Sequence, residues 1–325
     1  MNQEAKTNTT IRPLLEEELD EADRILRLAF GTFLGLPDPT LFMGDAGYVK
    51  TRWRADPASA FAAEMDGSLV GSNFASNWGS VGFFGPLSVR TDLWDKGIGG
   101  RLVEAVMQRF ADWKSEHLGL FTWSHSPKHV YLYQKFGFWP RFLTAIMSKS
   151  IVQNLMVGEA ASDSGWLRLS TLSESEQKSA LEECKEVSGA IYDGLDLTRE
   201  IDAVISQELG ETVLLYEGSM LVGFAVCHCG AGTEAGSGAC YVKFGGIRPG
   251  PNAGAQFERL LDTTASFAAE EGLQVLIAGA NTGRNEAYRK LLQRGFRADI
   301  LGVAMHQKND PGYNQPDVYV IDDWR

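Results

Sequence analysis

A cluster of glycines between a strand pattern and a helix pattern is the stretch best suited to bind an anion. Leu87 and Val89 flank a polar residue, as in a β-strand, and apolar residues recur at helical spacing from Leu102 onward. The glycines of the turn between them are Gly97, Gly99 and Gly100. Glycines let the main chain approach a phosphate closely, and the helix N-terminus behind them carries about half a positive charge. The stretch therefore predicts a phosphate-binding loop.

The spacing of these glycines excludes two common nucleotide-binding loops. Leu102 stands where the dinucleotide fingerprint requires its third glycine, and the Gly-Lys-Ser/Thr ending of the NTPase phosphate loop is absent. A plain turn between a strand and a helix explains the glycines alone equally well. A second motif is needed to choose between these interpretations.

That second motif is Leu132-Tyr133-Gln134-Lys135-Phe136-Gly137-Phe138, a predicted helix end capped by Gly137 and followed by an aromatic strand. The glycine loop and this helix end together resemble the GNAT superfamily of N-acetyltransferases. In that family the coenzyme A loop reads Arg/Gln-x-x-Gly-x-Gly/Ala, and a later helix ends Leu-Tyr-x-x-x-Gly-Phe. Two positions depart from the pattern: Trp94 replaces the usual Arg or Gln, and Ser126 stands where Asn is frequent.

The resemblance implies acetyl-CoA as the cofactor, held mainly by backbone N–H groups. The residues expected to contact it are Leu87, Ser88, Val89, Trp94, Asp95, Lys96, Gly97, Ile98, Gly99, Gly100 and Ser126. Tyr133 would be the general acid that protonates the departing thiolate, and a core tyrosine at a helix end is the alternative. Because Trp94 offers no phosphate donor of the Arg or Gln type, we expect a changed cofactor affinity.

No general base is evident in the sequence. The stretch Phe83–Val89 contains no Asp, Glu or His, so the carboxylate that some family members carry there is missing. His125 or Glu64 is the candidate base, with Asp38 as a further option, and each has an ordinary surface or structural role as its alternative. An amine that arrives uncharged would need no strong base.

Charge and cysteine content narrow the function classes. The net charge is −12. Residues 1–150 contain 16 basic and 17 acidic side chains, and residues 151–325 contain 14 basic and 25 acidic side chains. So acidic a chain is not expected to bind nucleic acid or an anionic membrane. All four cysteines lie after residue 150, which disfavours a cysteine-acyl intermediate in the half that carries the motifs. We expect buried free thiols, no metal site and a cytoplasmic protein.

The elements that must position these residues predict an α/β fold with a mixed sheet. A helix over 16–30 precedes an irregular stretch, 31–58, whose aromatic and acidic residues suit the wall of a pocket for a cationic amine. A hairpin at Asp66-Gly67 and strands on either side of the helix over 98–113 complete the sheet.

A tandem duplication is expected, giving two acyl-CoA N-acyltransferase-like domains. Gly67, Gly99 and Gly137 are echoed by Gly218, Gly254 and Gly295, at offsets of 151, 155 and 158 residues. We expect an intact domain at 1–150, a linker at 151–165, and a degenerate copy at 166–325. The copy has Leu291 at the position of Tyr133, and its loop contains prolines that lack N–H donors.

These observations favour an acetyl-CoA-dependent N-acetyltransferase that acts on a small amine by direct transfer in a ternary complex. A catalytically silent acyl-CoA sensor or interaction protein is the alternative, since Trp94 and the missing base permit it. A nucleotide-dependent oxidoreductase is a third, which the absent third glycine opposes. Three roles are open for the second copy: lining the acceptor pocket, bracing the first domain, or forming a homodimer.

Overall fold

A two-residue turn at Asp66-Gly67 connects two long strands in a computed structural model of the protein, which describes residues 9–151 and 165–325. Strand β2 (Ala60–Met65) pairs antiparallel with β3 (Ser68–Trp78). Both turn residues have positive φ, 51° at Asp66 and 73° at Gly67. Positive φ at both positions matches the right-handed twist of the flanking strands. The predicted hairpin is confirmed.

The chain divides into two units by its internal contacts. One unit comprises the residues up to Gly44 together with Tyr48–Ser76 and Phe83–Ser115; the other comprises Asp45–Gly47, Asn77–Gly82 and Glu116–Arg325. The expected linker at 151–165 lies almost wholly outside the described residues. The observed division instead falls after Ser115, so residues 116–150 group with the second half of the chain.

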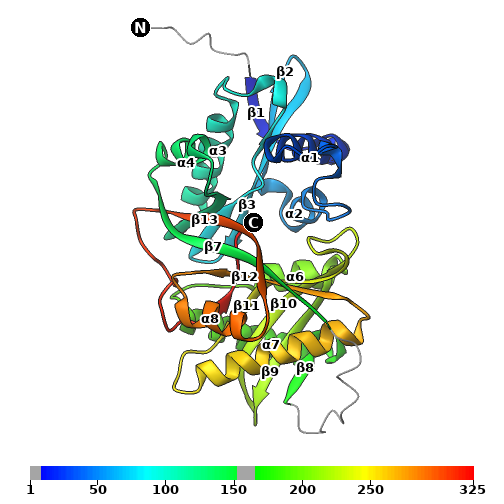
Figure 1. Ribbon diagram of the computed structural model, residues 1–325, viewed down its shortest axis with the longest axis vertical. Helices are drawn as coiled ribbons and strands as arrows, with labels where there is room; N and C mark the ends of the chain where they lie inside the picture. The colour runs from blue at the N-terminus through cyan, green and yellow to red at the C-terminus, as the bar shows by residue number, and fades with distance from the viewer. Residues whose placement is uncertain (1–8, 152–164) are drawn as a thin grey trace. The chain divides into compact units, whose positions relative to one another are not determined.

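The first unit is a small antiparallel sheet with helices on both faces (Figure 1). Strand β1 (Thr9–Pro13) pairs with β2, and β5 (Ser88–Val89) pairs with β3. Helix α1 (Leu19–Leu34) packs on the face that carries Ala60 and Ala62, with α2 (Val49–Ala55) beside it. Helix α3 (Ile98–Trp113) packs on the opposite face, against Ala63 and Val70. The sheet therefore separates α1 from the glycine loop that begins α3.

Helix α2 is a correction to the irregular stretch expected over 31–58. Its seven residues are too few to show a helical period in the sequence. It is anchored by the buried Arg52, which donates to the carbonyl of Gly85 at 2.6 Å, and by the indole of Trp53, which donates to that of Leu14 at 2.9 Å. Its stability thus depends on tertiary contacts.

The second unit is built on a mixed sheet in the order β6-β13-β7-β12-β11-β10-β9-β8, with β14 on β11 (Figure 1). Only β11 and β12 pair in parallel along this path. The strands are β6 (His117–Trp123), β7 (Phe138–Ser150), β8 (Trp166–Arg168), β9 (Gly210–Glu217), β10 (Met220–Gly230), β11 (Gly236–Ile247), β12 (Val275–Asn281), β13 (Arg297–Gln307) and β14 (Val320–Ile321). The strand β4 (Val81–Phe84) begins in this unit and ends in the first.

Helices cover both faces of the C-terminal part of this sheet. The long α7 (Ala253–Glu270) and α8 (Asn285–Gln293) pack on the main apolar core, which includes Cys227, Phe257 and Leu291. The other face, where His228 points, contacts α6 (Thr198–Ser206), and α5 (Glu174–Ile191) packs on β10 and β11. Helix α4 (Pro127–Gln134) lies against β6 and β7. No helix among residues 9–151 and 165–325 has the length and apolarity needed to span a bilayer.

The two halves of the sequence exchange strands within this unit. Strand β7 lies between β12 and β13, which both come from the second half, and β13 lies between β6 and β7 from the first half. Each half therefore supplies a strand to the other's sheet. This exchange is the physical reason why residues 116–150 group with residues 165–325.

The order of elements nonetheless repeats along the chain. The series β2-β3-β4-α3-β6-α4-β7 of the first half is matched by β9-β10-β11-α7-β12-α8-β13 in the second. This matching order is what the paired glycine motifs predict.

Candidate functional site

The glycine loop connects β5 to α3 in the first unit. A short 3-10 turn, Thr91–Leu93, follows β5, and Asp95 and Gly97 then have φ of +64° and +78°. Gly97 is the N-cap of α3. When residues with a left-handed backbone conformation alternate with residues in ordinary conformations, their successive N–H groups point toward the same side of the chain. These N–H groups together form a concave site for an anion.

The first turn of α3 has room for a phosphate. The N–H groups of Ile98, Gly99 and Gly100 have no acceptor within the helix, as at any helix N-terminus. A Cβ added at Gly97 or at Gly100 would meet none of the described atoms within 4 Å. The expected loop residues from Asp95 to Gly100 thus lie together at the N-terminus of α3, the kind of position at which helices bind phosphate groups.

Trp94 braces this loop. Its indole Nε1 donates to the carbonyl of Val89 at 2.9 Å, so the side chain ties the start of the loop back to β5. Val89 and Ser88 are also paired with Gly71 and Ser72 of β3. The carbonyl of Val89, one of the residues expected to contact the cofactor, therefore already accepts one hydrogen bond. Trp94 stands where the family has a side chain that can donate a hydrogen bond to phosphate, and here it makes a structural contact with β5 instead.

The two cations beside the loop differ in their roles. Arg101 donates through Nη1 to the carbonyl of Thr9 and so fastens α3 to β1. Lys96 is exposed at the loop. Lys96 is therefore the better placed of the two to approach an anion bound there.

Tyr133 is buried in the last turn of α4, in the second unit. The C-cap of α4 is Lys135 and not the predicted Gly137; Gly137, two residues farther on, has φ +79° and turns the chain toward β7. Burial raises the pKa of Tyr133 well above its usual value. The phenol therefore stays protonated at neutral pH, as a proton donor must.

The other expected site residues lie in several places. Ser126 is the buried N-cap of α4, and its Oγ accepts from the N–H of His129 at 3.4 Å. His125 is exposed next to it, with its ring 5.9 Å from that of Trp123. Glu64 belongs to the first unit, where its carboxylate accepts from Arg12 Nε at 2.6 Å. The structure thus groups the loop residues in one unit and Tyr133, Ser126 and His125 in the other.

A sequence model of the acetyltransferase (GNAT) family matches residues 22–138, which include both the glycine loop and Tyr133. These residues belong to the GNAT family. No curated protein sequence matches the chain.

Solved structures extend the similarity along the chain. A putative acetyltransferase from Pyrococcus horikoshii has a TM-score of 0.68 at 14% identity, covering 100% of this chain and 96% of its own. A GCN5-related N-acetyltransferase from Sphaerobacter thermophilus has a TM-score of 0.59 at 15% identity, covering 94% and 96%. The glucosamine N-acetyltransferase region of a fungal GH3 β-N-acetylglucosaminidase has 0.63 at 11%, covering 93% and 38%. At these identities the matches show the fold, a mixed α/β GNAT fold.

The second GNAT-like loop is closed where the first is open. Strand β12 pairs with β11 only as far as Val242. Farther along β11, Gly245 and Gly246 pair with β14 instead. The hydroxyl oxygen of Tyr319 would lie 2.8 Å from a Cβ added at Gly254, the glycine of the second loop. The ring of Tyr319 is 5.5 Å from that of Phe257. The chain's own residues thus cover the first turn of α7.

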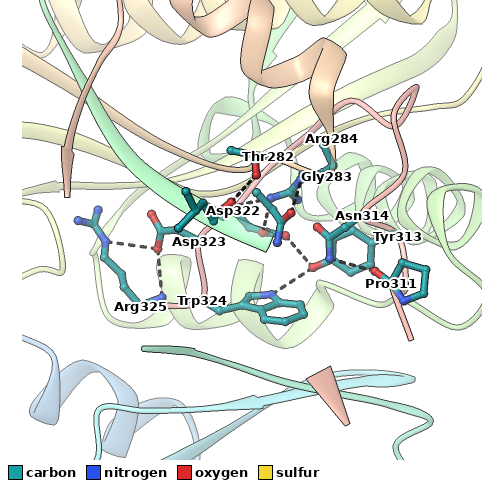
Figure 2. A network of polar contacts seen from close by, with 12 residues as sticks. Thr282, Gly283, Arg284, Pro311, Tyr313, Asn314, Asp322, Asp323, Trp324 and Arg325 are labelled. Atoms are coloured by element: carbon teal, nitrogen blue, oxygen red, sulfur yellow. Dashed lines mark hydrogen bonds and ion pairs between the residues drawn. The ribbon is translucent and has the colours of Figure 1, made fainter. Parts of the chain in front are cut away.

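A buried polar network around residues 310–325 was not predicted from the sequence (Figure 2). Tyr313 donates to Asp322 at 2.6 Å and accepts from the indole of Trp324 at 3.1 Å. Arg284 donates to Asp322 Oδ1 at 2.8 Å. These bonds hold residues 322–325 against the sheet, where Asp323 packs on Gly279 and burial raises its pKa. The partners are up to 38 residues apart, so no local pattern marks them.

A second buried cluster joins β10, β11 and α6. Lys243 Nζ lies 2.9 Å from Oε1 of both Glu200 and Glu234, and all three side chains are buried. The indole of Trp78 donates to Glu200 Oε2 at 3.1 Å. Burial alone would raise the pKa of Glu200, but the charges of Lys243 and His228 outweigh it and lower the pKa. Glu200 is therefore a paired structural anion.

Proposed function

We propose that this protein is an acetyl-CoA-dependent N-acetyltransferase that acetylates the amine of a small molecule by direct transfer. The observation that carries the proposal is the open first turn of α3, with Gly97 and Gly100 facing free space, within a GNAT family domain. Acyl-CoA-dependent N-acetylation is the activity typical of the family. The class of amine and the direct mechanism are our inference.

Each of the expected site residues would have its own role in the reaction. When bound, acetyl-CoA supplies an acyl group activated as a thioester. The N–H groups of Gly97 to Gly100 would hold its pyrophosphate, with Lys96 adding positive charge. Tyr133 would donate its proton to the departing sulfur, a contribution of about 10²–10⁴-fold.

The amine must reach the thioester without its extra proton. His125 or Glu64 would accept that proton, directly or through water, if the amine binds as its cation. Of the two, His125 lies beside the helix that carries Tyr133, whereas the carboxylate of Glu64 is engaged by Arg12. An amine that binds uncharged needs neither.

The second half would not bind a second cofactor. In the first half the strand before the loop is expected to pair with the pantetheine arm, and at the matching edge of β11 the backbone is paired with β14. Tyr319 occupies the space beside Gly254. These contacts support a working site in residues 1–150 and a degenerate copy in 166–325.

A catalytically silent acyl-CoA sensor is the second candidate. Trp94 favours it, because it replaces the Arg or Gln that would donate a hydrogen bond to phosphate, and its indole instead bonds the carbonyl of Val89. Such a protein would bind acetyl-CoA without turning it over.

Thermal unfolding with acetyl-CoA, coenzyme A and NAD tests the loop. Acetyl-CoA at a hundredfold excess over Kd should stabilise the protein by about 2.7 kcal/mol, and NAD should not. Gly100→Leu would fill the open space beside α3 and should abolish this shift without preventing folding. Gly189→Leu is the matched control, since this glycine also lies in a helix with open space at its Cα.

The outcomes separate the candidates. Equal shifts for wild type and Gly100→Leu would contradict cofactor binding at this loop. Stabilisation by acetyl-CoA with no release of free thiol across a panel of small amines would favour the sensor. Stabilisation by NAD alone would contradict both.

A further inference from the structure

Three of the four cysteines lie together on one face of the antiparallel pair β10–β11. Cys227 and Cys229 alternate on β10, and Cys240 on β11 is the register partner of Cys229. Cys227 and Cys240 are fully buried in the core beneath α7, whereas Cys229 is half-buried at its edge. The fourth, Cys184, is buried in α5, outside this core cluster.

The pairing of Cys229 with Cys240 has the geometry of a disulfide site. The N–H of Cys229 donates to the carbonyl of Leu209 at 2.8 Å, on the β9 side of the strand. Its backbone therefore points away from β11, which makes Cys229 and Cys240 a non-hydrogen-bonded pair. In such pairs the Cα atoms are about 4.5 Å apart and the side chains are closest. A disulfide accepts Cα separations of about 4.4–6.8 Å.

The three thiols are near neighbours on this face. Cys240 lies close enough to Cys227 and Cys229 to influence the pKa of both thiols. Among the described residues, no group of three or more His, Cys, Asp or Glu side chains is arranged to hold a metal ion. A directly cross-strand pair of thiols without metal-site geometry points to sulfur–sulfur chemistry.

We propose that Cys229 and Cys240 form a reversible intramolecular disulfide, with a small-molecule disulfide such as oxidised glutathione as the oxidant. The half-buried Cys229 reacts first: its thiolate attacks the glutathione disulfide, and one glutathione leaves as a thiolate. The Cys240 thiolate then attacks the Cys229 sulfur, and the second glutathione leaves. The two protein thiols lose two electrons and two protons, which convert oxidised glutathione to two thiols.

Cys227 is the competing partner, and the register decides against it. It pairs with Val242 across the sheet, so it lies diagonal to Cys240. Diagonal Cα atoms are about 7–8 Å apart, which is beyond the reach of an unstrained disulfide.

The surroundings make the reaction slow at neutral pH. The neighbouring Cys240 thiol, burial, and the nearby carboxylates of Glu271 and Glu211 all raise the pKa of Cys229. Because the thiolate is the nucleophile, the oxidation rate should rise about tenfold per pH unit between pH 7 and pH 9. The pair would therefore respond to sustained oxidation.

Closing this pair would restrain a hairpin that holds another part of the chain. Residues 230–239 connect the two cysteines, and Gly232 donates to the carbonyl of Asp45 at 3.1 Å. Gly47 donates to the carbonyl of Thr233 at 2.8 Å, and Ser237 N–H to Asp45 Oδ1 at 2.9 Å. Oxidation would thus limit the motion of residues 45–47 together with the hairpin.

The test is mass spectrometry of the full chain after incubation with oxidised glutathione and quenching with N-ethylmaleimide in denaturant. The reduced chain should take up four maleimides, and the oxidised chain two, with a mass loss of about 2 Da before labelling. Trypsin leaves all three cysteines in the fragment from Glu200 to Lys243. Cleavage after Glu217 and Glu234 then separates Cys240 from the other two, so a fragment pair joined through sulfur identifies the bond.

Variants assign the partners. Cys229→Ser and Cys240→Ser should each abolish the loss of mass, while Cys227→Ser and the control Cys184→Ser should retain it. Four maleimides on the oxidised wild type would overturn the proposal, and this measurement depends on no variant. Retention of the bond in Cys229→Ser would overturn the assignment in favour of Cys227, and disulfide-linked dimers would overturn an intramolecular bond.

Discussion

Acidification should destabilise the protein through a buried histidine of β13. His306 is fully buried, with its ring 4.7 Å from that of His117 on β6 and 5.2 Å from that of Trp324. Its Nδ1 donates to the carbonyl of Asp310 at 2.7 Å, and its Nε2 accepts from Asn314 at 3.4 Å. Both ring nitrogens are thus satisfied in the neutral form, and a second proton would face the amide donor of Asn314.

The structure sets the size and sign of the effect. Burial, His117 and Arg141 lower the pKa of His306 from 6.5 to about 3, against the opposing influence of Asp310. Burial also lowers the pKa of His117. A histidine with a depressed folded-state pKa stabilises the fold above pH 6.5, and that stability is lost as the pH falls toward the folded pKa. At 1.36 kcal/mol per pH unit, His306 alone should cost about 2 kcal/mol at pH 5 relative to pH 8.

Urea unfolding between pH 8 and pH 5 measures this cost. The difference in unfolding free energy between wild type and His306→Gln should shrink by about 2 kcal/mol over that range, because the variant has no proton to gain there. His125→Gln is the control, since that side chain is exposed. A wild-type minus His306→Gln difference that stays constant from pH 8 to pH 5 would refute the reasoning.

Two further substitutions test the site and the buried charges. Tyr133→Phe should lower kcat by about 10²–10⁴-fold, with the affinity for acetyl-CoA unchanged in calorimetry. Tyr131 is exposed on the same helix, so the control Tyr131→Phe should keep full turnover. Equal activity of the two variants would contradict the role of Tyr133 as general acid. Lys243→Met would remove the ammonium group between two buried carboxylates and should cost about 3–5 kcal/mol in urea unfolding. The control Lys185→Met removes an exposed ion pair with Asp196 and should cost less than about 1 kcal/mol; a similar loss in both would contradict the importance of burial.

Local signals predicted the elements whose geometry is set by a few neighbouring residues. Asp66-Gly67 could be interpreted from sequence because a two-residue hairpin turn demands positive φ, and Gly137 marks the turn after α4, where φ is also positive. The loop at Gly97 is predictable for the same reason. The burial of Cys227 follows from the apolar run that precedes it on its strand, whereas Cys184 is buried although its sequence neighbours are charged.

The features that sequence reasoning missed depend on distant partners. Whether β14 pairs with β11 cannot be inferred from two residues, and the indole of Trp94 gives no sign in the sequence that it contacts Val89. The polar network of Asp322 depends on residues from three separate segments. The strand exchange is of the same kind, since β7 and β13 resemble ordinary neighbours of β6 and β12.

That exchange constrains how the chain is made. Strand β7 leaves the ribosome well before its partners β12 and β13, and at 5–20 residues per second the delay up to the end of β13 is about ten to thirty seconds. Until β12 has been made both edges of this 13-residue strand lack their native partners, and the edge that pairs with β13 lacks its partner for the whole delay. The second unit must therefore complete its sheet late in synthesis, and β7 is the strand whose edges stay exposed until then.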